Sequence, residues 1–112
     1  EKTAKARGQF DRSALAVVVI SSPKPSDKVP LAEQILSAGA LCLGVLNAAS
    51  AKGWGANWIT GWTAHDPVFI AAAFDCTGGE TVAGIIHIGT MGADAPDRPR
   101  PDLDHLISWA KP

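Results

Sequence analysis

A proline-free and mostly apolar run from residue 31 to residue 52 constrains the fold of this chain more than any other segment. Pro30 precedes it and suits the first position of a helix, where the missing N–H has no partner to lose. Gly53 follows it as the kind of residue that ends a helix. Apolar residues recur with a period of 3.6 on one side, and the other side is apolar as well. A helix of this kind must be buried on most sides.

At 1.5 Å per residue this helix is about 33 Å long, as wide as a small domain. Gly39 and Gly44 cost helix propensity, about 1 kcal/mol each, and are understandable if another helix or chain approaches closely there. So long a buried helix in a chain of 112 residues predicts a dimer interface. The chain as a whole is long enough for one domain, covering residues 1–112.

Further elements follow from local patterns. Continuous β-branched or apolar stretches predict strands that are buried on both faces. Asp66 is a predicted N-cap, with Pro67 at the first helical position. The expected elements are a helix end and loop over 1–13, strands over 15–20, 56–60 and 81–89, helices over 30–52 and 67–74, and a last short helix over 103–110. Helices interleaved with strands place the chain in the α/β or α+β class.

Composition excludes several classes of protein. The apolar content of 46% and charged content of 19% predict a folded core and exclude disorder. A net charge of −1 gives no overall field that would attract nucleic acid. No signal peptide is visible, and no apolar run is both long and clean enough to span a bilayer. Cys42 and Cys76 fit no metal spacing, and we expect two free thiols in a cytoplasmic protein.

The segment from Gly53 to Trp62 combines three of the four tryptophans with three glycines. Glycine allows a close backbone approach, and tryptophan offers a large flat face, so the segment suits a flat aromatic ligand. A tight turn into a buried strand would have the same composition, and both interpretations remain open. A dinucleotide fingerprint is excluded, because Trp58 stands at the third glycine position and the segment follows a helix.

No set of side chains suggests catalysis by the protein alone. The histidines 65, 87 and 105 are scattered, and His87 is expected to be a hydrogen-bonded histidine of the core or the sheet edge. We therefore assign no catalytic and no metal-binding residue, and a cofactor would have to carry any chemistry. Arg98 and Arg100, each followed by proline, present forked donors that suit a phosphate. A solvated loop is the simpler alternative for this tail.

Three blocks in this order resemble the C-terminal half of an FMN-dependent nitroreductase, in particular the small single-domain NAD(P)H nitroreductases. The blocks are Lys28-Val29-Pro30 with Glu33-Gln34 and Ser37 to Ala40, then Ala51 to Gly61, and then Ile85 to Thr90 followed by the Arg-Pro-Arg-Pro tail. Together they cover about residues 14–112. The resemblance implies an α+β fold with a mixed, mainly antiparallel sheet flanked by helices, whose long central helix lies at the interface of a homodimer.

The resemblance also implies the cofactors and the site. FMN would lie at the dimer interface, with the backbone of Trp58, Ile59, Thr60 and Gly61 beside the flavin ring and Arg98 and Arg100 at its phosphate. NAD(P)H would reduce the flavin, and a nitroaromatic, quinone or related small molecule would accept the electrons. Family members are about twice as long, and their N-terminal half carries an Arg/Ser-rich flavin-binding motif, so we expect this chain to be a partial domain. The alternative is a non-catalytic dimerisation or binding module without flavin.

Overall fold

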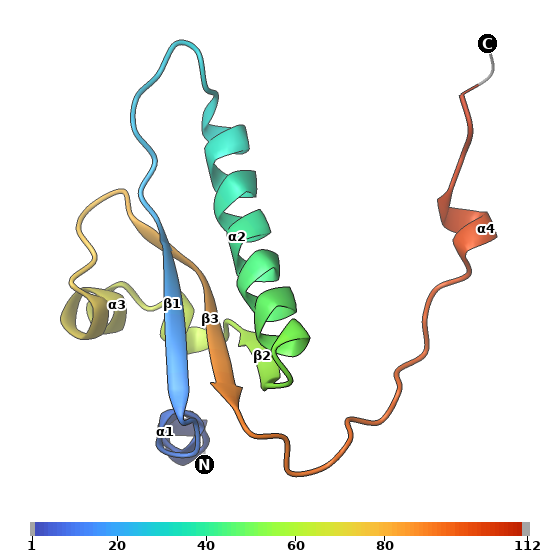
Figure 1. The fold of residues 1–112 in the computed structure, drawn as a ribbon. Helices are drawn as coiled ribbons and strands as arrows, with labels where there is room; N and C mark the ends of the chain where they lie inside the picture. The colour runs from blue at the N-terminus through green and yellow to red at the C-terminus, as the bar shows by residue number, and fades with distance from the viewer. Residues whose placement is uncertain (1, 111–112) are drawn as a thin grey trace.

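The computed structural model describes residues 2–110 as three strands with helices on both sides (Figure 1). The strands pair in the order β1-β3-β2, and both pairings are antiparallel. In chain order the elements are α1 (Lys2–Asp11), β1 (Leu15–Ser21), α2 (Leu31–Ala51), β2 (Gly55–Ile59), the 3₁₀ turn η1 (Trp62–Ala64), α3 (Pro67–Phe74), β3 (Thr81–Gly89) and α4 (Leu103–Leu106). The expected α+β class is confirmed, and the predicted elements are present with shifts of a few residues at their ends.

β3 is the central strand, and its two faces belong to two separate cores. Ile86 is fully buried on the face that α2 covers, where it packs with Val19 and Cys42. Ile85, its neighbour in the strand, is fully buried on the opposite face beside Ala64. Phe10 of α1 and apolar residues of α3 complete this second core. The alternation of side chains along a strand thus explains why β3 is apolar throughout.

β1 is less buried than its sequence predicts. Val19 and Ser21 are buried, but Leu15 and Ile20 are exposed. The reason is that β1 lies at an edge of the described sheet and is covered over only part of its length. The pairing with β3 also shifts register between Val19 and Ile20, which adds a bulge near the end of the strand.

α2 covers Leu31–Ala51, one residue shorter at each end than predicted, with Pro30 as its N-cap and not at the first helical position, and with Lys52 as its C-cap. Its predicted burial on most sides is wrong for a single chain, because only Cys42 and Ala49 are buried. One side packs on the sheet, and the other side exposes Leu36 (71%) and Leu41 (57%). By length and composition alone α2 could also cross a membrane, contrary to the expectation from sequence; core helices of soluble proteins meet the same criterion.

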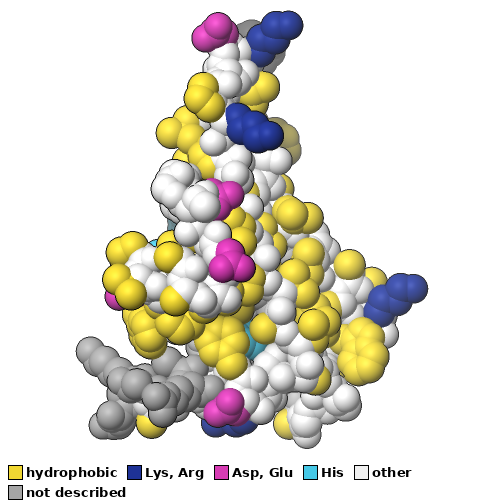
Figure 2. All heavy atoms as spheres, turned by 90° about the vertical axis from the view of Figure 1, so that its left-hand side faces the viewer, with side chains coloured by type: hydrophobic (Ala, Val, Ile, Leu, Met, Phe, Trp, Pro, Cys, Tyr) yellow, Lys and Arg dark blue, Asp and Glu magenta, His cyan; other side chains and the backbone are white. Residues whose placement is uncertain are grey.

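α3 forms as predicted, because the carboxylate of Asp66 accepts a hydrogen bond of 2.8 Å from the N–H of Phe69. The predicted last helix is shorter than expected and covers only Leu103–Leu106. The tail that carries it runs away from the sheet and from α2 (Figure 1). Figure 2 views the side of β1 and α3, where hydrophobic side chains cover much of the surface and charged side chains are few and scattered. Both cysteines are free, as expected.

Candidate functional site

The Trp58–Gly61 segment is the turn that leads from β2 into η1. Trp58 and Ile59 are the last residues of the strand, and Trp62 begins the 3₁₀ turn. Gly61 has φ 66° and ψ −168°, a combination that only glycine adopts readily. The segment from Gly53 to Trp62 therefore contains a turn whose backbone requires glycine at position 61.

Buried polar groups hold this turn in place. The hydroxyl of Thr63, which is 3% exposed, donates a hydrogen bond of 3.3 Å to the carbonyl oxygen of Thr60. The same hydroxyl accepts a hydrogen bond of 3.2 Å from the Nε2 of Gln9 in α1. The N–H of Ala64 donates to the carbonyl of Gly61 at 3.2 Å. Both carbonyls of the turn thus point toward the protein, and α1 contributes to its position.

The backbone N–H groups of Thr60 and Gly61, unlike their carbonyl groups, have no hydrogen-bond partner in the described part of the chain. Within the described residues, neither Thr60 nor Gly61 donates its backbone N–H to any hydrogen bond recorded outside the helices and strands. Gly61 is also exposed. Backbone N–H groups of this kind are strong donors that require a partner. The turn therefore offers donors to an acceptor atom outside the chain.

The indoles beside the turn are only partly covered. Trp58 is 37% exposed and Trp62 is 47% exposed. The Trp62 ring meets Phe69 of α3 edge-on, with 5.1 Å between the ring centroids. Trp58 is paired with Ile86 in the sheet, which places its side chain on the face that α2 covers.

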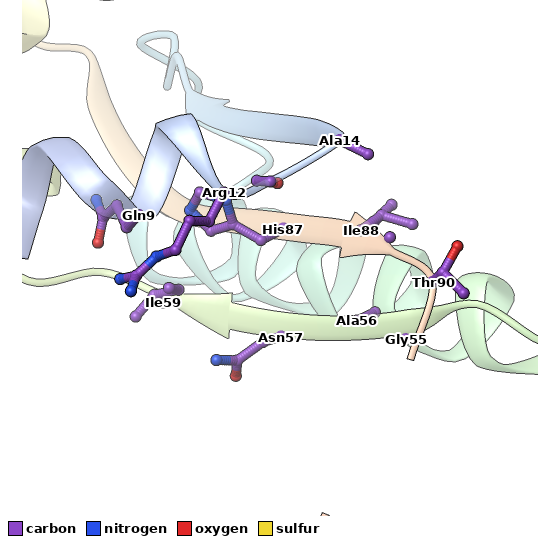
Figure 3. Close-up of a pocket in the computed structure, with 12 residues that line it drawn as sticks. Gln9, Arg12, Ala14, Gly55, Ala56, Asn57, Ile59, His87, Ile88 and Thr90 are labelled. Atoms are coloured by element: carbon purple, nitrogen blue, oxygen red, sulfur yellow. The ribbon is translucent and has the colours of Figure 1, made fainter. Parts of the chain in front are cut away.

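A cleft of about 380 Å³ lies on the other face of the sheet, beside the start of the same turn (Figure 3). Ile59 lines it together with Asn57 from β2, His87 from β3, Gln9 from α1, and Arg12 from the turn after α1. The volume falls in the range of small-molecule sites. Neither Arg12 nor Asn57 was predicted from the sequence; an asparagine inside a predicted strand, where this residue type is depleted, was the available signal for Asn57.

His87 differs from its sequence-based interpretation. It lies in β3 between Ala16 and Asn57 of the neighbouring strands, with the Phe10 ring 5.4 Å away between centroids. Both ring nitrogens are buried and have no hydrogen-bond partner among the described residues, so the expectation of a hydrogen-bonded histidine is wrong. Burial lowers the pKa of the imidazole, because the charged form loses its hydration.

The two arginines predicted at the flavin phosphate lie in the extended tail after β3. Arg100 forms an exposed ion pair with Asp97, with 3.7 Å between the charged groups. Because the tail runs away from the sheet (Figure 1), Arg98 and Arg100 do not lie beside the Trp58–Gly61 segment of the same chain. The other four predicted site residues, Trp58 to Gly61, are consecutive in the sequence, and the side chains of Trp58 and Ile59 lie on opposite faces of the sheet.

Comparison with known proteins adds to this geometry. The sequence model of the nitroreductase family matches residues 1–90, which is most of the chain. The chain belongs to the nitroreductase family. The matched region includes the whole sheet and the Trp58–Gly61 segment, and it stops before the tail with Arg98 and Arg100.

Two curated relatives have similar sequences. "Putative NAD(P)H nitroreductase YdjA" of Escherichia coli K12 is 34% identical over 86 residues, covering 77% of this chain and 46% of the relative. "Putative NAD(P)H nitroreductase" of Haemophilus influenzae is 35% identical over 92 residues, covering 80% of this chain and 49% of the relative. The chain therefore spans about half the length of these nitroreductases.

The fold is shared with a solved structure. The nitroreductase-like family protein from Bacillus cereus superposes with a TM-score of 0.78 at 23% sequence identity. The match covers 98% of this chain and 60% of that protein. The nitroreductase-like fold expected from the three sequence blocks is confirmed.

Proposed function

We propose that the protein is an FMN-dependent oxidoreductase that uses NAD(P)H to reduce nitroaromatic, quinone or related acceptors. Membership of the nitroreductase family and the names of the two relatives support an oxidoreductase. The observation that carries the proposal is the Trp58–Gly61 turn, whose backbone donors at Thr60 and Gly61 lack partners within the described residues.

The turn fits a flavin ring in shape and in hydrogen bonding. A flavin ring is flat and carries acceptor nitrogens and oxygens at its edge, so it complements exposed backbone N–H groups next to apolar walls. Thr63 binds the carbonyl oxygen of Thr60, and because this peptide bond is trans the N–H of Gly61 points away from that oxygen. The chemistry that FMN supplies when bound is acceptance of a hydride from NAD(P)H and transfer of the two electrons to the acceptor. The protein groups orient the ring and tune its electronic properties.

A homodimer is part of the proposal, and α2 supports it. Leu31, Ile35, Leu36, Leu41 and Leu43 are all at least half exposed. Exposed apolar surface of this extent marks an interaction site in a soluble protein. A Cβ added to Gly39 or Gly44 would meet no atom within 4 Å, so these glycines have no packing role within the chain. A second copy of the chain packed on the exposed side of α2 would cover part of this surface.

The dimer would also account for the tail. Arg98 and Arg100 lie in an exposed segment that leads away from their own sheet, and Arg100 forms a weak surface ion pair with Asp97. In a dimer such a tail can reach the partner subunit, and the two guanidinium groups would then hold the flavin phosphate at the partner's site. The proposed setting is the cytoplasm, with no nucleic acid or membrane as a partner.

The test uses the full-length protein that contains this chain. We expect a yellow preparation that releases free FMN on denaturation and oxidises NAD(P)H when a quinone or a nitroaromatic compound is added. Arg100→Ala is expected to weaken FMN binding by about 10- to 150-fold, because a hydrogen bond to a charged group contributes about 1.5–3 kcal/mol. Lys24→Ala, which removes an exposed positive charge from the loop between β1 and α2, is the matched control and leaves binding unchanged.

Two results would contradict the proposal. The first is a colourless protein that takes up no added FMN. The second is a stable flavin-free dimer in sedimentation that oxidises no NAD(P)H with any of these acceptors. Either result favours the alternative of a non-catalytic dimerisation module, in which Arg100→Ala changes only solubility.

A further inference from the structure

Gly84 forms a notch in the middle of the sheet, on the face that α2 covers. It is buried in β3 and opposite Val19 of β1. A Cβ placed on Gly84 would overlap the Nε1 of Trp58. It would also lie 2.7 Å from the Cδ1 of the same indole and 2.9 Å from the Sγ of Cys42. The indole therefore occupies the space that any other residue at position 84 would fill.

The two side chains beside Gly84, those of Cys42 and Trp58, differ in how easily they can move. Cys42 is fully buried and packs with Val19 and Ile86 in the core under α2. Displacing its sulfur would disturb a close-packed interior. Trp58 stands on β2, at the other edge of the described sheet, and is 37% exposed. A side chain at position 84 would thus move the Trp58 indole, and with it the end of β2.

A close contact of this kind is rare among the glycines of the described chain. An added Cβ would come within 3.0 Å of another atom at only two of them, Gly55 and Gly84. At Gly55 the closest atom belongs to Met91, a flexible and exposed side chain that can move away. At Gly84 the closest atoms belong to a rigid ring and to a buried thiol. The space above Gly84 is thus filled by the Trp58 indole and leaves no room for a side chain at position 84.

The indole in the notch fixes one end of the proposed flavin-binding turn. Trp58 is directly followed by Ile59, Thr60 and Gly61. The far end of the turn is held by the hydrogen bonds of Thr63 and Ala64 to the carbonyls of Thr60 and Gly61. The turn is therefore anchored by side-chain packing at its start and by polar contacts at its end. The N–H groups of Thr60 and Gly61 lie between these anchors.

We propose that Gly84 is a positioning residue for flavin binding, which acts by seating the Trp58 indole and so fixing the backbone donors of Thr60 and Gly61. The inference rests on the proposed function. Gly84 does not touch the flavin in this proposal, and its effect passes through Trp58. A shift of these donors would change the reduction potential of the bound flavin, because hydrogen bonds to the ring tune its electronic properties.

The test is the set Gly84→Ala, Trp58→Ala and the double variant, each made in the full-length protein. The readouts are FMN affinity by fluorescence titration and the midpoint potential and visible spectrum of bound FMN. Gly84→Ala is expected to weaken FMN binding by about 2- to 150-fold, the range that corresponds to the coupling between two residues in contact, here positions 84 and 58. Gly84→Ala is also expected to shift the midpoint potential and the absorption bands of the bound flavin. If the substitution only lowered the stability of the fold, the molecules that still bind FMN would keep the wild-type potential and spectrum. Gly78→Ala, in an exposed turn with open space around it, is the control.

The double variant decides the mechanism. Alanine at position 58 has no ring that could collide with the new methyl group, so in the Trp58→Ala background Gly84→Ala changes affinity, potential and spectrum no further. If Gly84→Ala does not fold, recovery of folding in the double variant, with the FMN affinity of Trp58→Ala, supports the proposal equally. A folded Gly84→Ala protein with the wild-type affinity and potential overturns it, and so does a double variant in which Gly84→Ala lowers the affinity by the same factor as in the wild-type background. A wild-type protein that binds no FMN refutes the proposed function together with this inference, whereas the other outcomes leave the proposed function intact.

Discussion

Replacing Gly61 with alanine tests whether the backbone shape of the turn, rather than any side chain, serves flavin binding. Gly61 has φ 66° and ψ −168°, in the region that is accessible almost only to glycine. Holding another residue there costs about 1–3 kcal/mol. No atom lies within 4 Å of a Cβ added at this position, so the whole cost comes from the backbone and none from a collision.

The strained variant has two ways to respond, and both can be measured. If the turn keeps its shape, the free energy of unfolding in urea falls by about 1–3 kcal/mol. If the turn relaxes, φ becomes negative and the N–H of Gly61 rotates away from its outward direction. FMN affinity then falls, by about 5- to 150-fold if the full strain energy is needed to restore the bound shape. We expect Gly61→Ala to lose both stability and FMN affinity.

Two other glycines provide matched controls for this variant. Gly79 has φ 89° and lies in the turn before β3, away from the proposed site. Gly79→Ala is expected to lose stability and keep its FMN affinity. Gly78→Ala, with no positive φ and open surroundings, is expected to change neither. If a structure of Gly61→Ala shows a relaxed turn and the variant still binds FMN like the wild type, the assignment of this turn to the flavin is refuted. If both its stability and its FMN affinity are unchanged, the strain argument itself is wrong.

Three further predictions concern the core and the caps. The folded-state pKa of His87 lies below its unfolded value of about 6.5, so the unfolded chain binds the proton more readily. In urea unfolding between about pH 8 and pH 5, the free energy of unfolding should therefore fall below about pH 6.5. His87→Phe should flatten this profile. Ile86→Ala should lower the free energy of unfolding by about 2–5 kcal/mol and Ile86→Val by only about 0.5–1.5 kcal/mol, and equal effects would contradict the described core. Asp66→Ala should cost about 1 kcal/mol in thermal unfolding through loss of the N-cap of α3, whereas Asp66→Asn should retain most of it.

Local signals in the sequence were sufficient to predict the elements of the fold. Pro30 and Gly53 bracket α2, and Asp66 with Pro67 starts α3, because caps act within one turn of a helix. The apolar character of β3 on both faces followed from its composition. Each of these features depends on residues that are close in the sequence, and for this reason they could be predicted without an alignment.

The features that depend on strand register could not be predicted in this way. The contact of Trp58 with Gly84 and Cys42 joins three elements, and the row of Ala16, His87 and Asn57 joins three strands. A shift of one residue in either pairing would turn these side chains to the other face of the sheet. The local pattern along one strand does not determine the pairing with the next, so neither the notch nor the cleft is visible in the sequence.

The long helix shows a different limit of sequence reasoning. α2 is apolar on nearly every side, so its periodicity does not reveal which side meets the sheet. The prediction of general burial followed from composition, whereas the structure of one chain covers one side only and leaves Leu36 and Leu41 exposed. The apolar pattern of a helix shows how much of its surface avoids water, but not which neighbour covers each side.

The strand order β1-β3-β2 has a consequence for how the protein is made. β1 and β2 each pair only with β3 among the described strands, and β3 is the last of the three to leave the ribosome. Until residue 89 has been synthesised, the earlier strands have unpaired backbone groups and α2 has no complete sheet to cover. Such non-local pairing is slow to form, and exposed strand edges promote aggregation. The nascent chain should therefore depend on chaperones until β3 emerges, and a ribosome stalled before residue 81 should carry a chain that proteases digest readily.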